Sequence, residues 1–216
     1  MSRQETAGII HADITDSSRF AQLHTPEVYN QVIRDFQTLA FNCIQPYRKT
    51  AGLRSRFYAG GYGDDIEAVI RERNQGDSAL HALRMAILLK QTWDQSDLGK
   101  QLKLLGQSQY GLQVNLSIGI GHGKVFMEKN AWSNNPRPEG RWILLTKVIQ
   151  ELSQKYAPDS LILATAEIKE AAQMAKLAIM FGESITLTPD KSYSLKLPDG
   201  KSPDLYPVLS YPQLAA

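Results

Sequence analysis

Near its N-terminus the chain reads Ala7-Gly8-Ile9-Ile10-His11-Ala12-Asp13-Ile14. A short apolar run of this kind predicts a buried strand. Its one acidic residue, Asp13, comes abruptly at the end of the run, which indicates that the strand ends at a functional edge. We expect the other elements to assemble around this strand.

A helix is expected soon after the strand. Thr25 is a favourable N-cap, Pro26 suits the first helical position, and apolar residues recur at three- and four-residue spacing from Val32 to Ile44. A helix with one apolar face needs a surface to cover, so we expect this helix to lie on a sheet.

The next segment has the pattern of a β-hairpin. The segments 54–58 and 66–70 flank a glycine-rich stretch that reads Ala59-Gly60-Gly61-Tyr62-Gly63-Asp64-Asp65. Glycines between two strand patterns favour a tight turn, so the acidic residues should lie at its tip. Asp77 and Ser78 then cap a second amphipathic helix.

The second half of the chain predicts further strands and one helix. Residues 112–120 alternate apolar with small or polar side chains, as in a strand with one face in the core. We expect a turn at 121–123, a partner strand over 124–127, a loop over 130–140 and a helix over 141–156. Short strands are expected around 161–163, 192–197 and 205–209. The order βα, ββ, αβ predicts an α+β fold, a ferredoxin-like palm with extra C-terminal strands, as one domain over residues 1–216.

Composition narrows the possible partners. The 24 Lys and Arg residues nearly balance the 22 Asp and Glu residues, so no basic surface for nucleic acid is expected. Cys43 is the single cysteine and cannot form an internal disulfide. No apolar window approaches the roughly 18 residues of a membrane span, and the N-terminus lacks a signal-peptide pattern. We therefore expect a cytoplasmic protein that binds neither membrane nor nucleic acid.

The two acidic edges are the strongest chemical signal. In a palm-type sheet the end of the first strand neighbours the tip of the hairpin, so Asp13 and Asp64 can share a pocket. Two adjacent carboxylates repel each other unless a cation neutralises them, and carboxylate oxygens suit Mg²⁺ or Mn²⁺. A two-metal site of this kind clamps the attacking and leaving oxygens of phosphoryl transfer. The alternative is that Asp13 caps a helix and Asp64 belongs to an ordinary acidic turn.

The turn after Asp13 is the expected phosphate site. It leads into a helix whose first N–H groups lack intrahelical partners and can hold a triphosphate. The candidate nucleotide-binding residues of this turn are Ile14, Thr15, Asp16, Ser17, Ser18 and Phe20. Ile14 joins Asp13 and Asp64 in the predicted metal ligands.

These segments together resemble the class III nucleotide cyclases. Residues 10–18 are similar to the family's FADIxGFT opening, 63–70 to its GDGFMAVF hairpin, 117–125 to its GIHTGxV strand, and 193–196 with 205–208 to its LKG…YxV ending. The resemblance implies that Asp13 and Asp64 bind two metals, and that two subunits pack head to tail and share residues across each site. It further implies that the ribose 3′ oxygen attacks the α-phosphorus and releases pyrophosphate.

The departures from the family pattern concern the base and the transition state. Gly60 stands where purine cyclases carry a base-reading lysine, and Arg137 where they carry the second base reader. Leu144 and Val148 occupy the positions of the family's transition-state Asn and Arg. Two cations on the same helix, Arg141 and Lys147, are candidate catalytic replacements, since the developing charge needs a positive group within reach.

Loss of the purine contacts makes the chain look like the pyrimidine cyclases of the Pycsar antiphage systems. Arg56 and Tyr58 crowd the hairpin and are candidate base contacts that fill the space left by a smaller base. The resemblance implies a homodimer that converts UTP or CTP to the cyclic monophosphate, which activates a separate effector protein in antiviral defence. Three alternatives stay open: an adenylate or guanylate cyclase, a diguanylate-cyclase-like palm with residues 60–65 as a stretched GGDEF loop, and a degenerate nucleotide-binding module.

Overall fold

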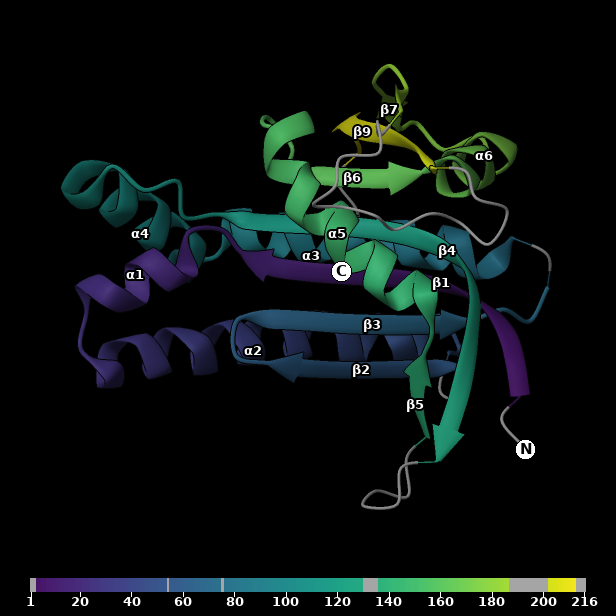
Figure 1. Ribbon diagram of the computed structural model, residues 1–216, viewed down its shortest axis with the longest axis horizontal. Helices are drawn as coiled ribbons and strands as arrows, with labels where there is room; N and C mark the ends of the chain where they lie inside the picture. The colour runs from purple at the N-terminus through teal and green to yellow at the C-terminus, as the bar shows by residue number, and fades with distance from the viewer. Residues whose placement is uncertain (1–2, 54, 75, 130–135, 187–201, 213–216) are drawn as a thin grey trace.

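The strands of the protein form one mixed sheet around its N-terminal strand. The computed structural model describes residues 3–53, 55–74, 76–129, 136–186 and 202–212. The described strands are β1 (Arg3–Ile14), β2 (Phe57–Tyr62), β3 (Asp65–Arg71), β4 (Leu116–Lys129), β5 (Pro136–Glu139), β6 (Ile162–Thr165), β7 (Met180–Phe181), β8 (Ile185–Thr186) and β9 (Asp204–Ser210). Their order is β2-β3-β1-β4-β6-β9-β7, with β5 paired to β4 and β8 to β9 (Figure 1).

The first four strands confirm the predicted palm. β1 is antiparallel to both β3 and β4, and β3 is antiparallel to β2. The resulting β2-β3-β1-β4 order is the ferredoxin-like arrangement, in which β1 and β2 run in the same direction with β3 between them. β6 adds to β4 in parallel, and β9 adds to β6, so the expected C-terminal extension of the sheet is also present.

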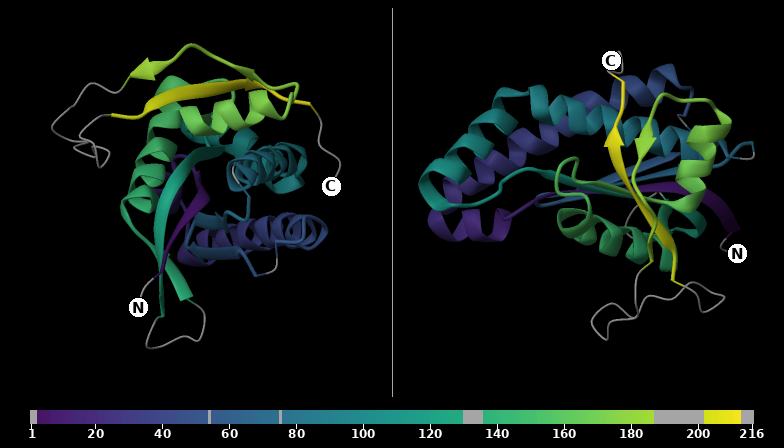
Figure 2. Two further views of the ribbon diagram at one scale, coloured as in Figure 1. Left: turned by 90° about the vertical axis from the view of Figure 1, so that its right-hand side faces the viewer. Right: turned by 90° about the horizontal axis from the view of Figure 1, so that it is seen from above.

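The helices cover the two faces of the sheet unequally. The described helices are α1 (Ser17–Leu23), α2 (Pro26–Thr50), α3 (Asp77–Gln95), α4 (Asp97–Leu105), a π-helical turn (Gly106–Tyr110), α5 (Arg141–Tyr156) and α6 (Ala166–Met174). α2 and α3 lie behind the sheet in Figure 1, and α5 crosses its front; the left view of Figure 2 shows them on opposite sides. No helix in the described part of the chain is long and apolar enough to cross a membrane.

Strand periodicity separates the apolar core from the face that carries chemistry. Successive side chains of a strand point to opposite faces, and in β1 the alternate residues Ile10, Ala12 and Ile14 join the large core beneath α2 and α3. Phe36 and Trp93 meet edge to face in this core with their ring centroids 5.6 Å apart. The other set of β1 residues, which includes His11 and Asp13, therefore faces the α5 side.

The predicted turn at 121–123 is wrong, because β4 runs unbroken through these residues and pairs with β1 along its length. The glycines of this part of β4 instead allow α5 to pack closely against the strand. A Cβ atom at Gly119 would lie 2.4 Å from the backbone N of Gln150, and one at Gly121 would lie 2.4 Å from Thr146 Oγ1. A Cβ atom at Gly123 would overlap the ring of Trp142. None of these glycines has a positive φ, so a turn conformation is not their purpose.

Other boundaries differ from the expectation in smaller ways. The polar segment before residue 112 contains α4 and the π-helical turn, and the Ser96 side chain caps α4 by accepting a hydrogen bond from Gly99 N at 3.0 Å. Residues 136–139 of the expected loop form β5 along β4. β2 starts at Phe57, later than expected. The helix over 141–156 is confirmed as α5, and the strand over 192–197 lies outside the described residues.

We predict that Gly119→Ala destabilises the protein by at least about 2 kcal/mol, because backbone atoms of α5 leave no space for a methyl group. Gly182→Ala is the matched control, since its Cβ would meet Pro207 side-chain atoms at an ordinary 3.4 Å. Urea unfolding of the two variants checks this, and equal stabilities would contradict the close approach of α5.

Candidate active site

Two aspartates meet where β1 ends and the β2–β3 hairpin turns. Asp13 lies directly opposite Asp65 in the β1–β3 pairing. Asp64 precedes Asp65 at the hairpin tip, and Gly63 makes the tight turn with a left-handed φ of 64°. The side chains of Asp13 and Asp64 lie within hydrogen-bonding reach of each other.

The pair is electrostatically strained in the absence of a cation. Burial, together with the negative charge of Asp64, raises the pKa of Asp13 to about 8, and Asp65 adds a further repulsion. A carboxyl group in this state holds a proton at neutral pH unless another positive charge replaces it. The arrangement therefore favours a bound cation at the two carboxylates.

The side chains of the site supply only some of the oxygen ligands that a hard divalent ion needs. In the ranges that the structure describes, no group of three or more His, Cys, Asp or Glu side chains gathers around one point. Mg²⁺ and Mn²⁺ accept carboxylate, main-chain and water oxygens and commonly retain substrate phosphates as ligands. Asp13 and Asp64 would thus hold the ions, with main-chain oxygens such as that of Ile14, phosphate and water at the other positions.

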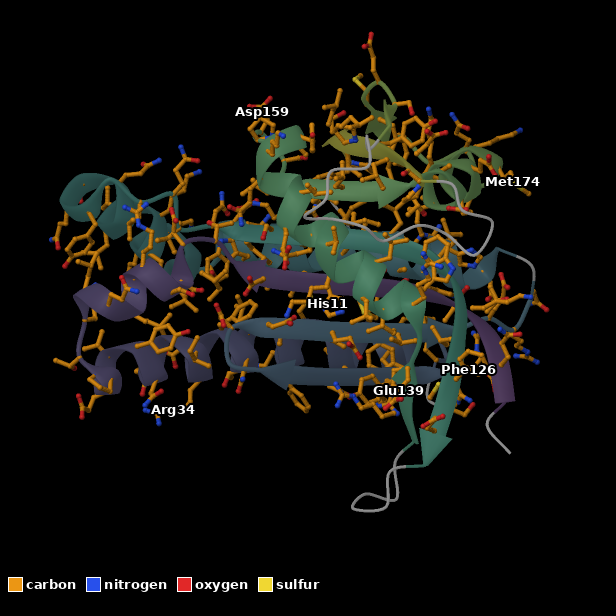
Figure 3. The ribbon with its side chains drawn as sticks, in the orientation of Figure 1. His11, Arg34, Phe126, Glu139, Asp159 and Met174 are labelled. Carbon is orange, nitrogen blue, oxygen red and sulfur yellow. The ribbon has the colours of Figure 1, made fainter. Side chains whose placement is uncertain are left out.

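A second charged cluster lies beside the acidic pair and was missed by the sequence reasoning. The ring of His11 sits between two carboxylates of β3, with Nδ1 at 3.3 Å from Asp65 Oδ1 and Nε2 at 3.3 Å from Glu67 Oε2. The Asp65 contact is a hydrogen bond, whereas the Glu67 contact is a charge contact without good hydrogen-bond alignment. Figure 3 shows His11 at the middle of the sheet, beside α5.

The cluster keeps His11 positively charged at neutral pH. Burial alone would lower the pKa of His11, but Asp65 and Glu67 together raise it to about 9. Asp65 also contacts Lys147 of α5, with Nζ 3.5 Å from Oδ2. Its pKa is lowered despite its burial, because His11 and Lys147 stabilise the ionised form. The acidic pair therefore borders a group of alternating charges.

Tyr29 of α2 lies close enough to the acidic pair to feel its charge, and it is another residue that sequence reasoning did not identify. Burial raises its pKa, with further contributions from the charges of Asp64 and Asp13, and its hydroxyl hydrogen-bonds with Ser17. Ser17 is buried at the start of α1. Of the predicted turn residues, Ser17 is thus the one whose side chain is linked to the acidic pair through a neighbour.

The other side chains of the predicted phosphate turn hold the turn in place. The Thr15 hydroxyl donates to the Gln113 carbonyl and accepts from Asn115 N at 2.9 Å. Asp16, in a left-handed conformation with φ 56°, accepts from Gln113 N at 2.9 Å. Phe20 is buried in the core, and Ser18 is exposed. These contacts leave phosphate binding to the N–H groups of the first turn of α1.

Of the three residues considered as base contacts, Tyr58 lies beside Gly60, whereas Arg56 and Arg137 lie far from the acidic pair. A Cβ atom at Gly60 would lie 2.8 Å from the hydroxyl of Tyr58, so the tyrosine occupies the space beside Gly60. Arg56 lies at the opposite end of the hairpin from Asp64 and forms an ion pair with Asp77 at 2.9 Å. Arg137 is exposed on β5 opposite Glu128, roughly 35 Å along β4 from the partner of Asp13. One chain therefore does not bring Arg56 or Arg137 to its own acidic pair.

The two candidate catalytic cations on α5 also differ. Lys147 lies over Asp65, whereas Arg141 is the exposed first residue of the helix, roughly 9 Å further along its axis. Leu144 is 60% exposed and Val148 is partly buried, so the two positions between and beside these cations offer no hydrogen-bonding group.

The alternation of side chains along two paired strands would have predicted the charged cluster. His11 and Asp13 are alternate residues of one strand, and Asp65 and Glu67 are alternate residues of another, so a correct register places all of them on one face. Aligned on Asp13 and Asp64, His11, Asp65 and Glu67 stand where the family motifs quoted above have F, G and M. The charged cluster is therefore a joint departure from that pattern.

We predict that His11 makes stability depend on pH. Because its folded-state pKa of about 9 lies above the unfolded value of 6.5, its contribution is fully present below pH 6.5 and is lost as pH rises through 9. The stability difference between the wild type and His11→Phe should shrink by on the order of 3 kcal/mol over that interval. Chemical unfolding at each pH measures it, and a difference that does not change with pH would refute the buried charged histidine.

Comparison with known proteins reveals likeness in structure without likeness in sequence. No protein-family model and no curated protein matches the chain. The adenylyl cyclase CyaB from P. aeruginosa matches 99% of this chain and 98% of its own, with a TM-score of 0.72 and 13% identity.

Two further solved structures match at similar levels. The guanylyl cyclase domain of the RhoGC fusion protein from Blastocladiella emersonii, described as a non-canonical dimer, matches 96% of this chain and 98% of its own, with a TM-score of 0.63 and 14% identity. An adenylate cyclase from Trypanosoma brucei, solved in a monomeric state, matches 98% and 92%, with a TM-score of 0.65 and 13% identity. The chain therefore has the palm fold of the adenylyl and guanylyl cyclase catalytic domains.

Proposed function

We propose that the protein is a metal-dependent nucleotide cyclase that converts a pyrimidine nucleoside triphosphate, UTP or CTP, to its 3′,5′-cyclic monophosphate and pyrophosphate. One observation carries the proposal: the carboxyl groups of Asp13 and Asp64 converge at the edge of a cyclase-type palm, where burial and the charge of Asp64 together raise the pKa of Asp13 to about 8. A surface that binds no cation has no use for two acids held together against their repulsion.

The residues of the site divide the work of this reaction. Divalent ions, when bound, supply the positive charge that activates the 3′ oxygen and neutralises the triphosphate. Asp13 and Asp64 would hold these ions, while N–H groups in the first turn of α1 would bind phosphate oxygens. Thr15 and Asp16 keep this turn in register with residues 113–115. The ribose 3′ oxygen would bond to the α-phosphorus as the bond to the pyrophosphate oxygen breaks, and the hydroxyl proton would pass to solvent water.

The preference for a pyrimidine rests on the hairpin. Gly60 offers no side chain to read a base, and the Tyr58 hydroxyl fills the volume that such a side chain would need. A pocket narrowed in this way favours the smaller ring. We further propose that the protein acts as a homodimer, in which Arg56 and Arg137 would serve the partner's nucleotide. The cyclic product would activate a separate effector in antiviral defence, as the resemblance to pyrimidine cyclases implies.

A second candidate function is nucleotide binding without catalysis. It is favoured by Leu144 and Val148, which replace the transition-state Asn and Arg implied by the cyclase resemblance and cannot hydrogen-bond to a phosphate. A sensor of this kind would bind the metal–triphosphate complex and leave it unchanged.

Product formation separates these functions. The purified protein, incubated with each of the four ribonucleoside triphosphates and Mn²⁺, should yield cyclic UMP or cyclic CMP, identified by mass. Asp64→Asn should lower the rate at least roughly a hundredfold, whereas Asp35→Asn, an exposed residue of α2, should not change it. A dominant purine product would contradict the pyrimidine preference, and unchanged triphosphates would favour the binding module.

A second experiment tests the metal assignment without catalysis. In the unfolded chain Asp13 ionises near pH 3.8, whereas in the metal-free folded protein it stays protonated up to about pH 8, so the folded state loses stability across this interval. Asp13→Asn should therefore be more stable than the wild type above pH 8, by on the order of 5 kcal/mol. Mn²⁺ should raise the melting temperature of the wild type but not of this variant. Equal responses to Mn²⁺ would remove Asp13 from the metal site.

A further inference from the structure

We propose that Lys147 binds the triphosphate at the acidic pair of its own chain, so that each site takes this cation in cis. The proposal rests on the proposed function and specifies it further. It departs from the arrangement implied by the cyclase resemblance, in which each site borrows residues of this helix from the partner subunit.

The position of Lys147 is set by the main chain of α5 and not by its exposed side chain. Backbone atoms of Thr146 and Gln150 approach Gly119 so closely that a Cβ atom there would lie 2.4 to 2.5 Å from them. Helix and strand are thus in direct backbone contact. Lys147 immediately follows Thr146, so its Cα has little freedom to move relative to the sheet.

A hydrogen-bonded chain then ties the same helix to Asp13 itself. Gln150 Nε2 donates to Ser117 Oγ at 2.6 Å, and Ser117 Oγ donates to the main-chain oxygen of Asp13 at 3.1 Å. Gln150 and Ser117 are both buried. Residues three apart are neighbours on a helix, so Lys147 lies one turn before this link to Asp13.

Contacts of the ammonium group show where it points. Lys147 Nζ lies 3.5 Å from Asp65 Oδ2, and Asp65 is the cross-strand partner of Asp13. Opposed residues of an antiparallel pair have Cβ atoms roughly 5 Å apart. A triphosphate chelated at Asp13 and Asp64 would therefore lie within reach of the lysine.

The ion pair with Asp65 orients the Lys147 side chain but leaves it able to turn to another anion. Lys147 is 52% exposed, and such surface pairs contribute little to stability, so the ammonium can turn to a phosphate at low cost. Asp65 keeps its other oxygen on His11, which holds the carboxylate in place when Lys147 moves. The charged cluster thus presents a cation to its own acidic pair.

The rest of α5 offers no polar group at the positions from which the family would act in trans. Leu144 and Val148 are apolar, and Arg141 lies at the start of the helix, away from Asp65. Arg141→Ala is therefore the matched control for Lys147→Ala: the same helix loses an exposed cation at a different distance from the acids.

The first measurement is affinity for the Mn²⁺ complex of a non-hydrolysable triphosphate analogue, made on the full chain by calorimetry. Lys147→Ala should weaken binding at least about tenfold, Lys147→Arg should retain most of it, and Arg141→Ala should stay within about threefold of the wild type. Circular dichroism checks that each variant is folded. Unaltered affinity in Lys147→Ala would overturn the proposal.

Hybrid dimers then decide between cis and trans. Asp64→Asn and Lys147→Ala chains with different tags are co-expressed, and the heterodimer is isolated on both tags. If the cation acts in cis, each half of the hybrid lacks one component and no tight analogue site forms. If it acts in trans, the intact acids of one chain meet the intact lysine of the other and one tight site per dimer returns. Recovery of one tight site would overturn the proposal; its absence, or tight binding by a monomer, supports it.

Two reference samples make this result independent of the proposed function. A wild-type chain paired with Asp64→Asn should bind one analogue per dimer, and a hybrid of Asp13→Asn with Asp64→Asn none. Because binding is the readout, the hybrid result stands even where no cyclic product forms, which would contradict the cyclase assignment alone. Conversely, an active cyclase whose hybrid regains a site would keep the proposed function and lose the cis lysine.

Discussion

Repulsion between the carboxylates of Asp13 and Asp64 is the constraint on which the candidate site depends. The two acids meet because β1 ends beside the tip of the β2–β3 hairpin. Antiparallel pairing of β3 with both β1 and β2 fixes this register. The fold could relieve the strain by separating the acids, yet it keeps them together in a site where burial and the charge of Asp64 raise the pKa of Asp13 to about 8. A site that stores unfavourable charge in this way is suited to bind cations and, through them, phosphate.

The elements around this pair have complementary tasks. The glycines of β4 allow α5 to lie directly on the sheet, and this contact places Lys147 over Asp65. His11, buried between Asp65 and Glu67, keeps a positive charge inside a group of acids that would otherwise repel one another. Shortly after Asp13 in the chain, Thr15 and Asp16 fix the turn that leads into α1. Packing and charge thus converge on one edge of the sheet.

Local sequence patterns predicted the palm and the acidic pair, because strand alternation, the glycine-rich hairpin and helix caps act over a few residues. The same reasoning misread Gly121 and Gly123 as a turn, since a glycine that admits a helix looks the same in sequence as one that bends the chain. It passed over His11 and Glu67 because their partnership exists only through the register of β1 and β3. Identity of 13–14% to solved cyclases shows how far side chains can change while this backbone persists.

The most direct test of the central claim is the pKa of the Asp13 carboxyl group, measured in metal-free protein by NMR titration of its side-chain carbon and compared with Asp64→Asn. We expect a pKa of about 8 in the wild type, and a clear fall when the charge at Asp64 is removed. A wild-type pKa near the ordinary value of 3.8, unaffected by the substitution, would show that the two carboxyl groups do not share a site and would contradict the account.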